Sequence, residues 1–229
     1  MKVSKLVVTI DEKVLVDISF EISSSLALVG QSGSGKSLTL KAILGMLPSD
    51  MRCEMEYDAE FELRAKWAIS FVPQNPFTAL SPLTRIKKQF FVPRQRVEEL
   101  FAQVGLDAEL LERFPSELSG GQLQRVIIAM ALEHKPKLIL LDEPTTALDP
   151  KTRVAILELL KEFQAKFGFK ILFVTHDMNS AKSLCEDICV IKGGKVMESG
   201  KMSEVLQNPQ NEYTKTLIDA NFANRKFRI

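Results

Sequence analysis

The sequence predicts an α/β domain with a largely parallel sheet, and two kinds of segment point to this class. Short apolar runs, typical of strands buried on both faces, occur at Leu26–Val29 and Lys137–Asp142, and Lys170–Thr175 is a further predicted strand. Helical patterns separate these runs, at Lys36–Leu44 and Pro150–Phe167. Alternating strands and helices favour parallel pairing, because each helix carries the chain back along the sheet.

Antiparallel strands are expected beside this core. Partly alternating, β-branched residues predict strands at Leu6–Ile10 and Val14–Ile22, and Trp67–Val72 adds another. Gly193 and Gly194 separate two further strand-like runs, at 188–191 and 195–198, which predicts a hairpin.

Residues 75–135 contain no buried-strand pattern, so we expect a helical insertion within a single domain that covers residues 1–229. The helices expected in it are Arg94–Val104, Ala108–Phe114 and Gln122–His134. Residues 49–68 are poorly patterned and carry many charges. The tail from residue 203 is helical in pieces and basic at its end.

Two aspartates are placed to begin helices. Asp149 precedes Pro150 and is expected to be the N-cap of the helix that ends near Phe167. Asp177 can cap the helix Met178–Cys185 in the same way.

Composition excludes several classes. The net charge of +1 gives no basic excess for nucleic acid, and 45% apolar content allows a sizeable core. No apolar run is long enough to cross a bilayer, and the N-terminus lacks the apolar block of a signal peptide, so we expect a cytoplasmic chain. Cys185 and Cys189 could resemble a metal pair. We interpret them instead as small core residues, because no other Cys or His is near them in sequence.

A phosphate-binding loop follows the first buried strand. Residues 30–37 match the pattern G-x-x-x-x-G-K-[ST], with a strand before and a helix after. The glycines allow backbone amides to approach phosphate oxygens, and the helix N-terminus adds partial positive charge. Lys36 supplies a full charge and Ser37 a hydroxyl for magnesium. The residues of this P-loop are Gly30, Gln31, Ser32, Gly33, Ser34, Gly35, Lys36 and Ser37.

Two acids end a second buried strand, at Asp142 and Glu143. In a doubly wound sheet the carboxyl ends of the strands face the ligand. Asp142 is therefore expected to hold magnesium, and Glu143 to act as a general base or to orient water beside the γ-phosphate. Solvated acids at a strand end are the alternative interpretation.

The segment Leu118–Gln122, with sequence LSGGQ, begins a helix. Ser119 and Gln122 fit a capping box, and Gly120 and Gly121 leave the helix N-terminus bare enough to receive an anion. Taken alone, this segment could be only a well-capped helix.

These motifs, in this order, resemble those of the ATP-binding subunits of ABC transporters, and the resemblance covers nearly the whole chain. LSGGQ between the two nucleotide-binding motifs is very specific for that family. The resemblance implies a P-loop NTPase fold with a RecA-like core, antiparallel β elements and a helical subdomain. It also implies an ATP hydrolase with ATP and Mg²⁺ as cofactors.

The resemblance gives roles to three further residues, each unremarkable alone. Gln74 matches the Q-loop residue that senses magnesium and the attacking water. His176 matches the switch histidine that contacts the γ-phosphate. Asp149 ends a segment, from Thr146, that matches the D-loop at the dimer interface. His134 matches no family motif, and we expect only a helix-end residue there.

The resemblance also implies partners. Each ATP is expected between the P-loop of one subunit and the Ser119–Gln122 segment of a second ABC ATPase subunit, with a heterodimer favoured over a homodimer. The other partners are two integral membrane permease subunits and, indirectly, an extracytoplasmic substrate-binding protein. This places the chain on the cytoplasmic face of the inner membrane as a peripheral protein, without nucleic acid.

Two departures from the family are visible. Residues Leu6–Val16 contain no Tyr, Phe or Trp to stack on adenine, which puts base selectivity in question but not phosphate binding. Ser24 and Ser25 replace the usual Gly-Glu before the P-loop strand.

Residues 74–76 and 79–83, with Tyr213–Leu217, resemble the peptide/nickel importer branch. The short tail and residues 45–48 resemble the nickel-importer ATPase, so nickel uptake is the leading expectation. A dipeptide or oligopeptide importer is the alternative. A soluble ABC protein outside transport, or a degenerate regulatory subunit, fits less well.

Overall fold

The computed structural model describes residues 1–223, and the chain divides into two compact units. One comprises Met1–Leu63 and the chain from Lys170 onward, and the other comprises Arg64–Phe169. The basic end of the tail, expected from sequence, lies outside the described residues.

The first unit is built on a mixed sheet with strand order β4-β1-β2-β9-β8-β3-β7. Its centre is β3 (Ser25–Val29), which is buried along its whole length and pairs in parallel with β7 (Lys170–Thr175) and β8 (Asp187–Lys192). The apolar run of β3 therefore has the two-sided burial expected of a central parallel strand.

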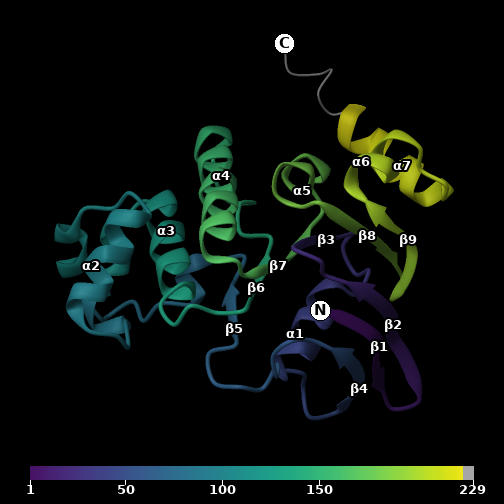
Figure 1. Ribbon diagram of the computed structural model, residues 1–229, viewed down its shortest axis with the longest axis horizontal. Helices are drawn as coiled ribbons and strands as arrows, with labels where there is room; N and C mark the ends of the chain where they lie inside the picture. Colours follow the sequence, from purple (N-terminus) through teal and green to yellow (C-terminus); the bar gives the residue numbers. More distant parts are fainter. Residues whose placement is uncertain (224–229) are drawn as a thin grey trace. The chain divides into compact units, whose positions relative to one another are not determined.

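Antiparallel strands complete this sheet (Figure 1). β1 (Lys2–Ile10) lies between β2 (Lys13–Glu21) and β4 (Met51–Asp58), and β9 (Lys195–Lys201) pairs with β8 across the Gly193–Gly194 turn. The helices of this unit are α1 (Lys36–Leu44), α5 (Met178–Leu184), α6 (Met202–Gln207) and α7 (Glu212–Ala223).

The second unit holds two parallel strands, β5 (Ile69–Val72) and β6 (Leu138–Asp142). Its α-helices are α2 (Arg94–Gln103), α3 (Gly120–Ala131) and α4 (Pro150–Phe167). Short 3₁₀ helices η1 to η4 fill the connections, at Pro76–Thr78, Ile86–Gln89, Ala108–Glu112 and Pro115–Glu117. Residues 75–135 contain helices and no strand; that they form a distinct subdomain of one ABC domain stays a prediction.

Several elements differ from the sequence expectations; β1, for example, begins at Lys2 and not at Leu6. The strand β4 was not expected in the poorly patterned residues 49–68. The helix expected at Ala108–Phe114 is a 3₁₀ helix ending at Glu112, because Phe114 precedes Pro115 and is held extended. The helix expected from Gln122 begins at Gly120 and ends at Ala131. The α/β class, the hairpin and the caps at Asp149 and Asp177 are confirmed.

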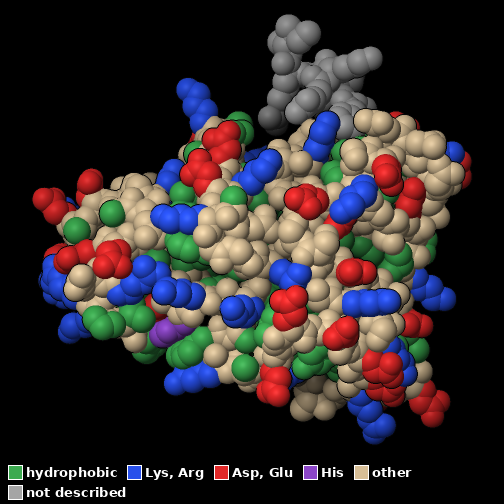
Figure 2. Space-filling model, viewed as in Figure 1, with side chains coloured by type: hydrophobic (Ala, Val, Ile, Leu, Met, Phe, Trp, Pro, Cys, Tyr) green, Lys and Arg blue, Asp and Glu red, His purple; other side chains and the backbone are tan. Residues whose placement is uncertain are grey.

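Charges of both signs are interspersed over the face shown in Figure 2, in keeping with the net charge of +1. Among the described residues, no helix combines the length and apolar character needed to span a membrane.

Candidate functional site: a P-loop and a capped signature helix

The P-loop connects the end of β3 to the start of α1. Its first residue, Gly30, packs so closely on the end of β8 that an added Cβ would lie 2.3 Å from the carbonyl oxygen of Ile191. The Ser34 amide turns back to donate to the Gln31 carbonyl at 3.2 Å. The loop is therefore held against the central strands before it enters α1 at Lys36.

Lys36 lies inside this loop and is buried. Its Nζ donates to the carbonyl oxygens of Gly30 and Gln31, at 2.7 and 3.0 Å. The Lys36 ammonium group is already buried and hydrogen-bonded to loop carbonyls. It can therefore exchange these partners for phosphate oxygens without a further cost of removing it from bulk water. The loop thus carries a full positive charge at the helix N-terminus, where an anion is favoured.

The β8–β9 turn braces the loop from one side. The Gly194 amide donates to the Ser34 carbonyl at 3.0 Å, while the Gly194 carbonyl accepts the Asp17 amide at 2.7 Å. Gly194 has φ +76°, and an added Cβ would lie 2.0 Å from the carbonyl oxygen of Leu15. Only glycine permits both this left-handed backbone and this approach to β2.

The Leu118–Gln122 signature segment begins α3 as the sequence predicts. The Ser119 amide donates to Gln122 Oε1 at 2.9 Å, and the Gln122 amide donates to Ser119 Oγ at 3.3 Å. This reciprocal capping box orients Ser119 Oγ at the helix N-terminus. Because a hydroxyl accepts and donates at once, Ser119 can still donate its proton to an anion in this position.

The start of α4 packs against the signature segment. An added Cβ at Gly121 would lie 2.8 Å from Thr152 Cγ2, so this position requires a residue without a side chain. A shallow hollow of about 370 Å³ opens here, bordered by Ser119, Gln122 and the basic residues Arg125 and Lys151. A helix N-terminus beside two cationic side chains favours an anionic ligand.

Asp149 is the N-cap of α4. Its Oδ1 accepts the amides of Lys151 and Thr152, at 3.0 and 3.1 Å. The side chain and the backbone amide of Thr152 donate hydrogen bonds to Asp149, and so does the backbone amide of Lys151. These bonds lower the pKa of Asp149 below its ordinary value. The carboxylate is therefore occupied with capping.

The two acids lie at the carboxyl end of β6. Asp142 is its last residue, and Glu143 follows with φ +45°, a left-handed conformation that is uncommon for a residue with a side chain. Strained backbone of this kind is concentrated at functional sites. Thr146 Oγ1 donates to Glu143 Oε2 at 3.0 Å and so fixes the carboxylate.

Gln74 and His176 each follow a strand end. Gln74 is exposed, two residues beyond β5, and Val72 pairs with Leu141, the residue before Asp142. His176 is exposed directly after β7, and its neighbour Thr175 pairs with Val29, the residue before Gly30. Within the first unit, His176 therefore lies at the carboxyl ends of the strands, where the P-loop also begins. Within the second unit, Gln74 lies at the carboxyl ends of β5 and β6, where Asp142 and Glu143 also lie.

Two contacts of aromatic residues are not indicated by any sequence motif. Trp67 stacks on His134, with ring centroids 3.7 Å apart, so His134 is more than a helix-end residue. Tyr213 contacts the P-loop residue Gln31 across 182 positions of sequence, and no local pattern could have indicated that contact.

Cys185 and Cys189 behave as core residues, as expected, whereas Cys53 is exposed. Cys185 and Cys189 are buried at the end of α5 and in β8. Burial raises the pKa of Cys189 to about 12 and, with the nearby Asp187 and Glu186, raises that of Cys185 well above its ordinary value. Because the thiolate is the metal-binding form, these thiols are poor ligands. No cluster of three or more His, Cys, Asp or Glu suited to a metal occurs among residues 1–223.

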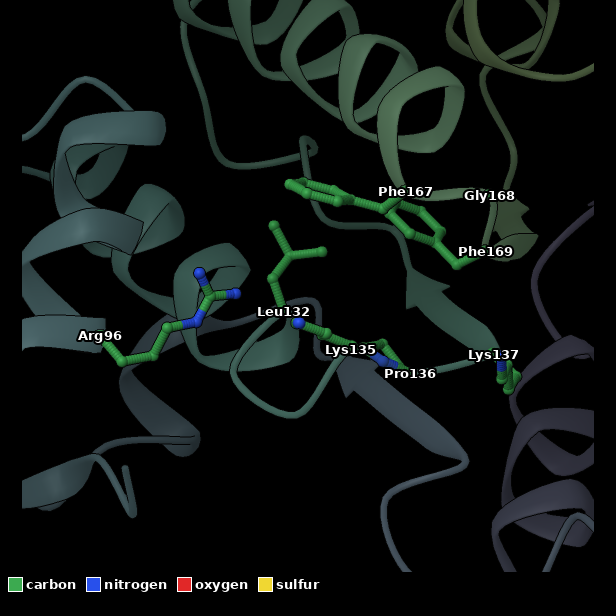
Figure 3. A pocket seen from close by; sticks show the side chains of 8 residues that line it. All are labelled: Arg96, Leu132, Lys135, Pro136, Lys137, Phe167, Gly168 and Phe169. Carbon is green, nitrogen blue, oxygen red and sulfur yellow. The ribbon is translucent and has the colours of Figure 1, made fainter. Parts of the chain in front are cut away.

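Figure 3 shows a separate pocket of about 200 Å³ in the second unit. Leu132, Phe167 and Phe169 give it an apolar wall, and Arg96 reaches toward Leu132 from α2. None of the site residues expected from sequence lines it, so we assign it no part in the chemistry.

Comparison with known proteins agrees with the motifs. The family model described as ABC transporter matches residues 15–146. The peptidoglycan transport ATP-binding protein YejF of Agrobacterium fabrum is 40% identical over 89% of this chain. The chain spans only 42% of that relative's length. The dipeptide transport ATP-binding protein DppD of Lactococcus lactis is 34% identical, over 92% of this chain and 68% of its own length.

Two solved structures share the fold. The protein cbiO1 from Clostridium perfringens, part of an ABC transporter complex, aligns with a TM-score of 0.74 and 26% identity, covering 98% of this chain and 96% of cbiO1. A dimeric ATP-binding cassette in a post-hydrolysis state with ADP and Pi aligns with a TM-score of 0.71 and 29% identity, covering 88% of this chain and 98% of its own. Together with the matched family model, these relatives show that the chain belongs to the ABC transporter family.

Proposed function

We propose that the chain binds and hydrolyses ATP to power an importer of peptides or peptide-like solutes. The observation that carries this proposal is the P-loop, with Lys36 held between the carbonyls of Gly30 and Gln31 at the N-terminus of α1. The solved relative with ADP and Pi supports a nucleotide as the ligand.

The proposed site divides its tasks among the residues described above. The P-loop, residues 30–37, holds the phosphates, with Lys36 moving from the loop carbonyls to phosphate oxygens. Glu143 accepts a proton from the attacking water or orients it, as Thr146 holds its carboxylate. His176 contacts the γ-phosphate, and Gln74 responds to the attacking water.

Magnesium fits the donor set that the sequence provides. The Ser37 hydroxyl and the Asp142 carboxylate, with the Gln74 amide oxygen, are hard oxygen ligands of the type Mg²⁺ prefers. When bound, the ion neutralises charge on the phosphate oxygens during phosphoryl transfer.

The second half of each site is proposed to come from another ABC ATPase subunit. Ser119, Gly121 and Gln122 border a hollow together with the basic residues Arg125 and Lys151, and Gly120 begins the helix beside it. The helix N-terminus and the two cations favour an anion there. This hollow would receive the γ-phosphate of ATP held by the partner's P-loop, with Asp149 at the interface. The relative solved as a dimer supports the pairing of two such subunits, and for this chain we favour a heterodimer over a homodimer.

Membrane subunits complete the proposed machine. The relatives' descriptions as transport ATP-binding proteins, and cbiO1's place in a transporter complex, support two integral membrane permeases as partners. A substrate-binding protein outside the membrane would deliver the cargo. The chain would then lie on the cytoplasmic face of the inner membrane.

The nature of the cargo is the point on which the comparisons change our expectation. Nickel was the leading expectation from sequence, and peptides were the alternative. The relatives are described as transporting dipeptides, oligopeptides or peptidoglycan, which supports the alternative over nickel.

Complementation of a deletion strain tests the proposal. The strain should lose peptide uptake, and the wild-type gene should restore it, whereas Lys36→Ala should not. Lys41→Ala is the matched control, because Lys41 is an exposed lysine of the same helix outside the loop. Normal peptide uptake in the deletion strain, with nickel uptake lost, would overturn the peptide cargo and leave the ATPase assignment standing.

A further inference from the structure

The helix α7 reaches the P-loop through the side chain of Tyr213. Tyr213, in the first turn of α7, accepts a hydrogen bond at its hydroxyl oxygen from the Gln31 amide, at 3.1 Å. Gln31 is the second residue of the loop. The amide that Tyr213 binds belongs to the peptide unit between Gly30 and Gln31.

Lys36 holds the other end of that same peptide unit. The Gly30 carbonyl oxygen accepts Lys36 Nζ at 2.7 Å, while the Gln31 N–H points to Tyr213. A peptide unit is planar, so fixing the direction of its N–H also fixes the direction of its C=O. The Tyr213 hydroxyl thereby sets the orientation of a group that Lys36 contacts.

Tyr213 is itself held by the strands that flank the loop. Lys192, the last residue of β8, places its Nζ 4.6 Å from the centroid of the Tyr213 ring, within the range of a cation–π contact. Glu198 of β9 accepts the amides of Gln210 and Asn211 just before α7, at 2.8 and 3.1 Å. The Asn211 side chain then accepts the Tyr213 amide at 2.8 Å. Figure 1 shows α7 beside α6, which follows the carboxyl end of β9.

We propose that Tyr213 is a positioning residue for the nucleotide site. By holding the first peptide unit of the P-loop, it keeps the loop in the conformation that binds phosphate. This inference rests on the proposed function. Tyr213 acts through the Gly30–Gln31 peptide, whose N–H it accepts and whose C=O accepts Lys36. Its loss lowers the fraction of loops competent to bind, which weakens apparent affinity in proportion and leaves the chemical step nearly unchanged.

The test compares Tyr213→Phe with Tyr57→Phe. Each variant removes one hydroxyl and keeps its ring. Tyr57 lies exposed on β4 in the same unit, and these are the chain's two tyrosines. Hydrogen exchange at the Gln31 amide, without nucleotide, should be about 2- to 12-fold faster in Tyr213→Phe than in wild type, the range for one hydrogen bond. In Tyr57→Phe it should be unchanged.

Steady-state hydrolysis supplies the second measurement, made on the complex with its partner subunits. The KM for MgATP should rise by about 2- to 12-fold in Tyr213→Phe, with kcat within about 2-fold of wild type. Unchanged exchange at Gln31, an unchanged KM, or a loss confined to kcat would each overturn the inference. A wild-type complex that neither binds nor hydrolyses MgATP would overturn the proposed function itself, while the exchange measurement still decides whether Tyr213 holds the loop.

Discussion

Alanine at Gly194 is expected to damage the fold and the nucleotide site together, and alanine at Gly193 offers a matched control. Both glycines lie in the β8–β9 turn with positive φ, +54° at Gly193 and +76° at Gly194. A left-handed backbone costs a residue with a side chain about 1–2 kcal/mol, so both variants carry that cost. They differ in what the added Cβ meets.

The space around the two positions sets the difference in magnitude. A Cβ at Gly193 meets nothing within 4 Å, whereas at Gly194 it would lie 2.0 Å from the Leu15 carbonyl oxygen. Ordinary carbon–oxygen contact is well above 3 Å, so the turn must move away from β2. Overpacking of this kind costs about 1–3 kcal/mol more. For a chain of this size, that difference lowers Tm by roughly 2–12 °C beyond the loss in Gly193→Ala.

Movement of the turn also removes a support of the P-loop, because the Gly194 amide donates to the Ser34 carbonyl. The dissociation constant for MgATP should therefore rise by about 2- to 12-fold in Gly194→Ala and stay near wild type in Gly193→Ala. Thermal melting and calorimetric titration measure the two quantities. Equal losses of Tm in both variants, or unaltered MgATP binding by Gly194→Ala, would refute the reasoning.

Three further outcomes are expected. Thr146→Val should lower kcat by about 3- to 10-fold through the lost hydrogen bond to Glu143, and Thr146→Ser should restore it; equal rates in both would contradict this. Ser119→Ala in one subunit of a mixed dimer should slow hydrolysis at the partner's P-loop, and a loss confined to its own P-loop would oppose the shared site. Because the pKa of Asp149 is lowered on folding, its contribution to stability is present above the unfolded pKa, near 4, and is lost as pH falls below it. Asp149→Asn should thus flatten the fall of Tm below about pH 4, and an unchanged acid profile would show that this cap is not responsible.

The core of the fold was predictable because its signals are local. The buried run of β3, the capping residues Ser119 and Asp149, and the Gly193–Gly194 turn each act within a few residues of sequence. The elements that they specify are all present, although α3 covers Gly120–Ala131 and not Gln122–His134.

The strand β4 was missed for a physical reason. Its residues Arg52, Glu54, Glu56 and Asp58 are exposed, and only Met51 and Met55 are partly covered, so it lacks a strong apolar alternation. It forms at the edge of the sheet by pairing with β1, and edge strands often carry charges. Such a strand depends on its partner more than on its own sequence.

The site, like the fold, has parts that the sequence predicts and parts that depend on the folded chain. The loop, the acids and the signature segment could be named from spacing, because phosphate binding requires consecutive residues. The left-handed backbone of Glu143 and the contact of Tyr213 with Gln31 could not be named, since both depend on the folded chain. In the sequence, the segment Tyr213–Leu217 indicates only a branch of the family.

Hydrolysis by a Glu143→Gln variant tests the central claim most directly. The substitution keeps the shape of the side chain and removes its negative charge, so MgATP binding should persist while turnover falls by about 100-fold or more. Glu158→Gln, an exposed position on α4, should match wild type. The account predicts a variant that holds ATP without cleaving it. Wild-type turnover by Glu143→Gln, measured in the same complex, would contradict it.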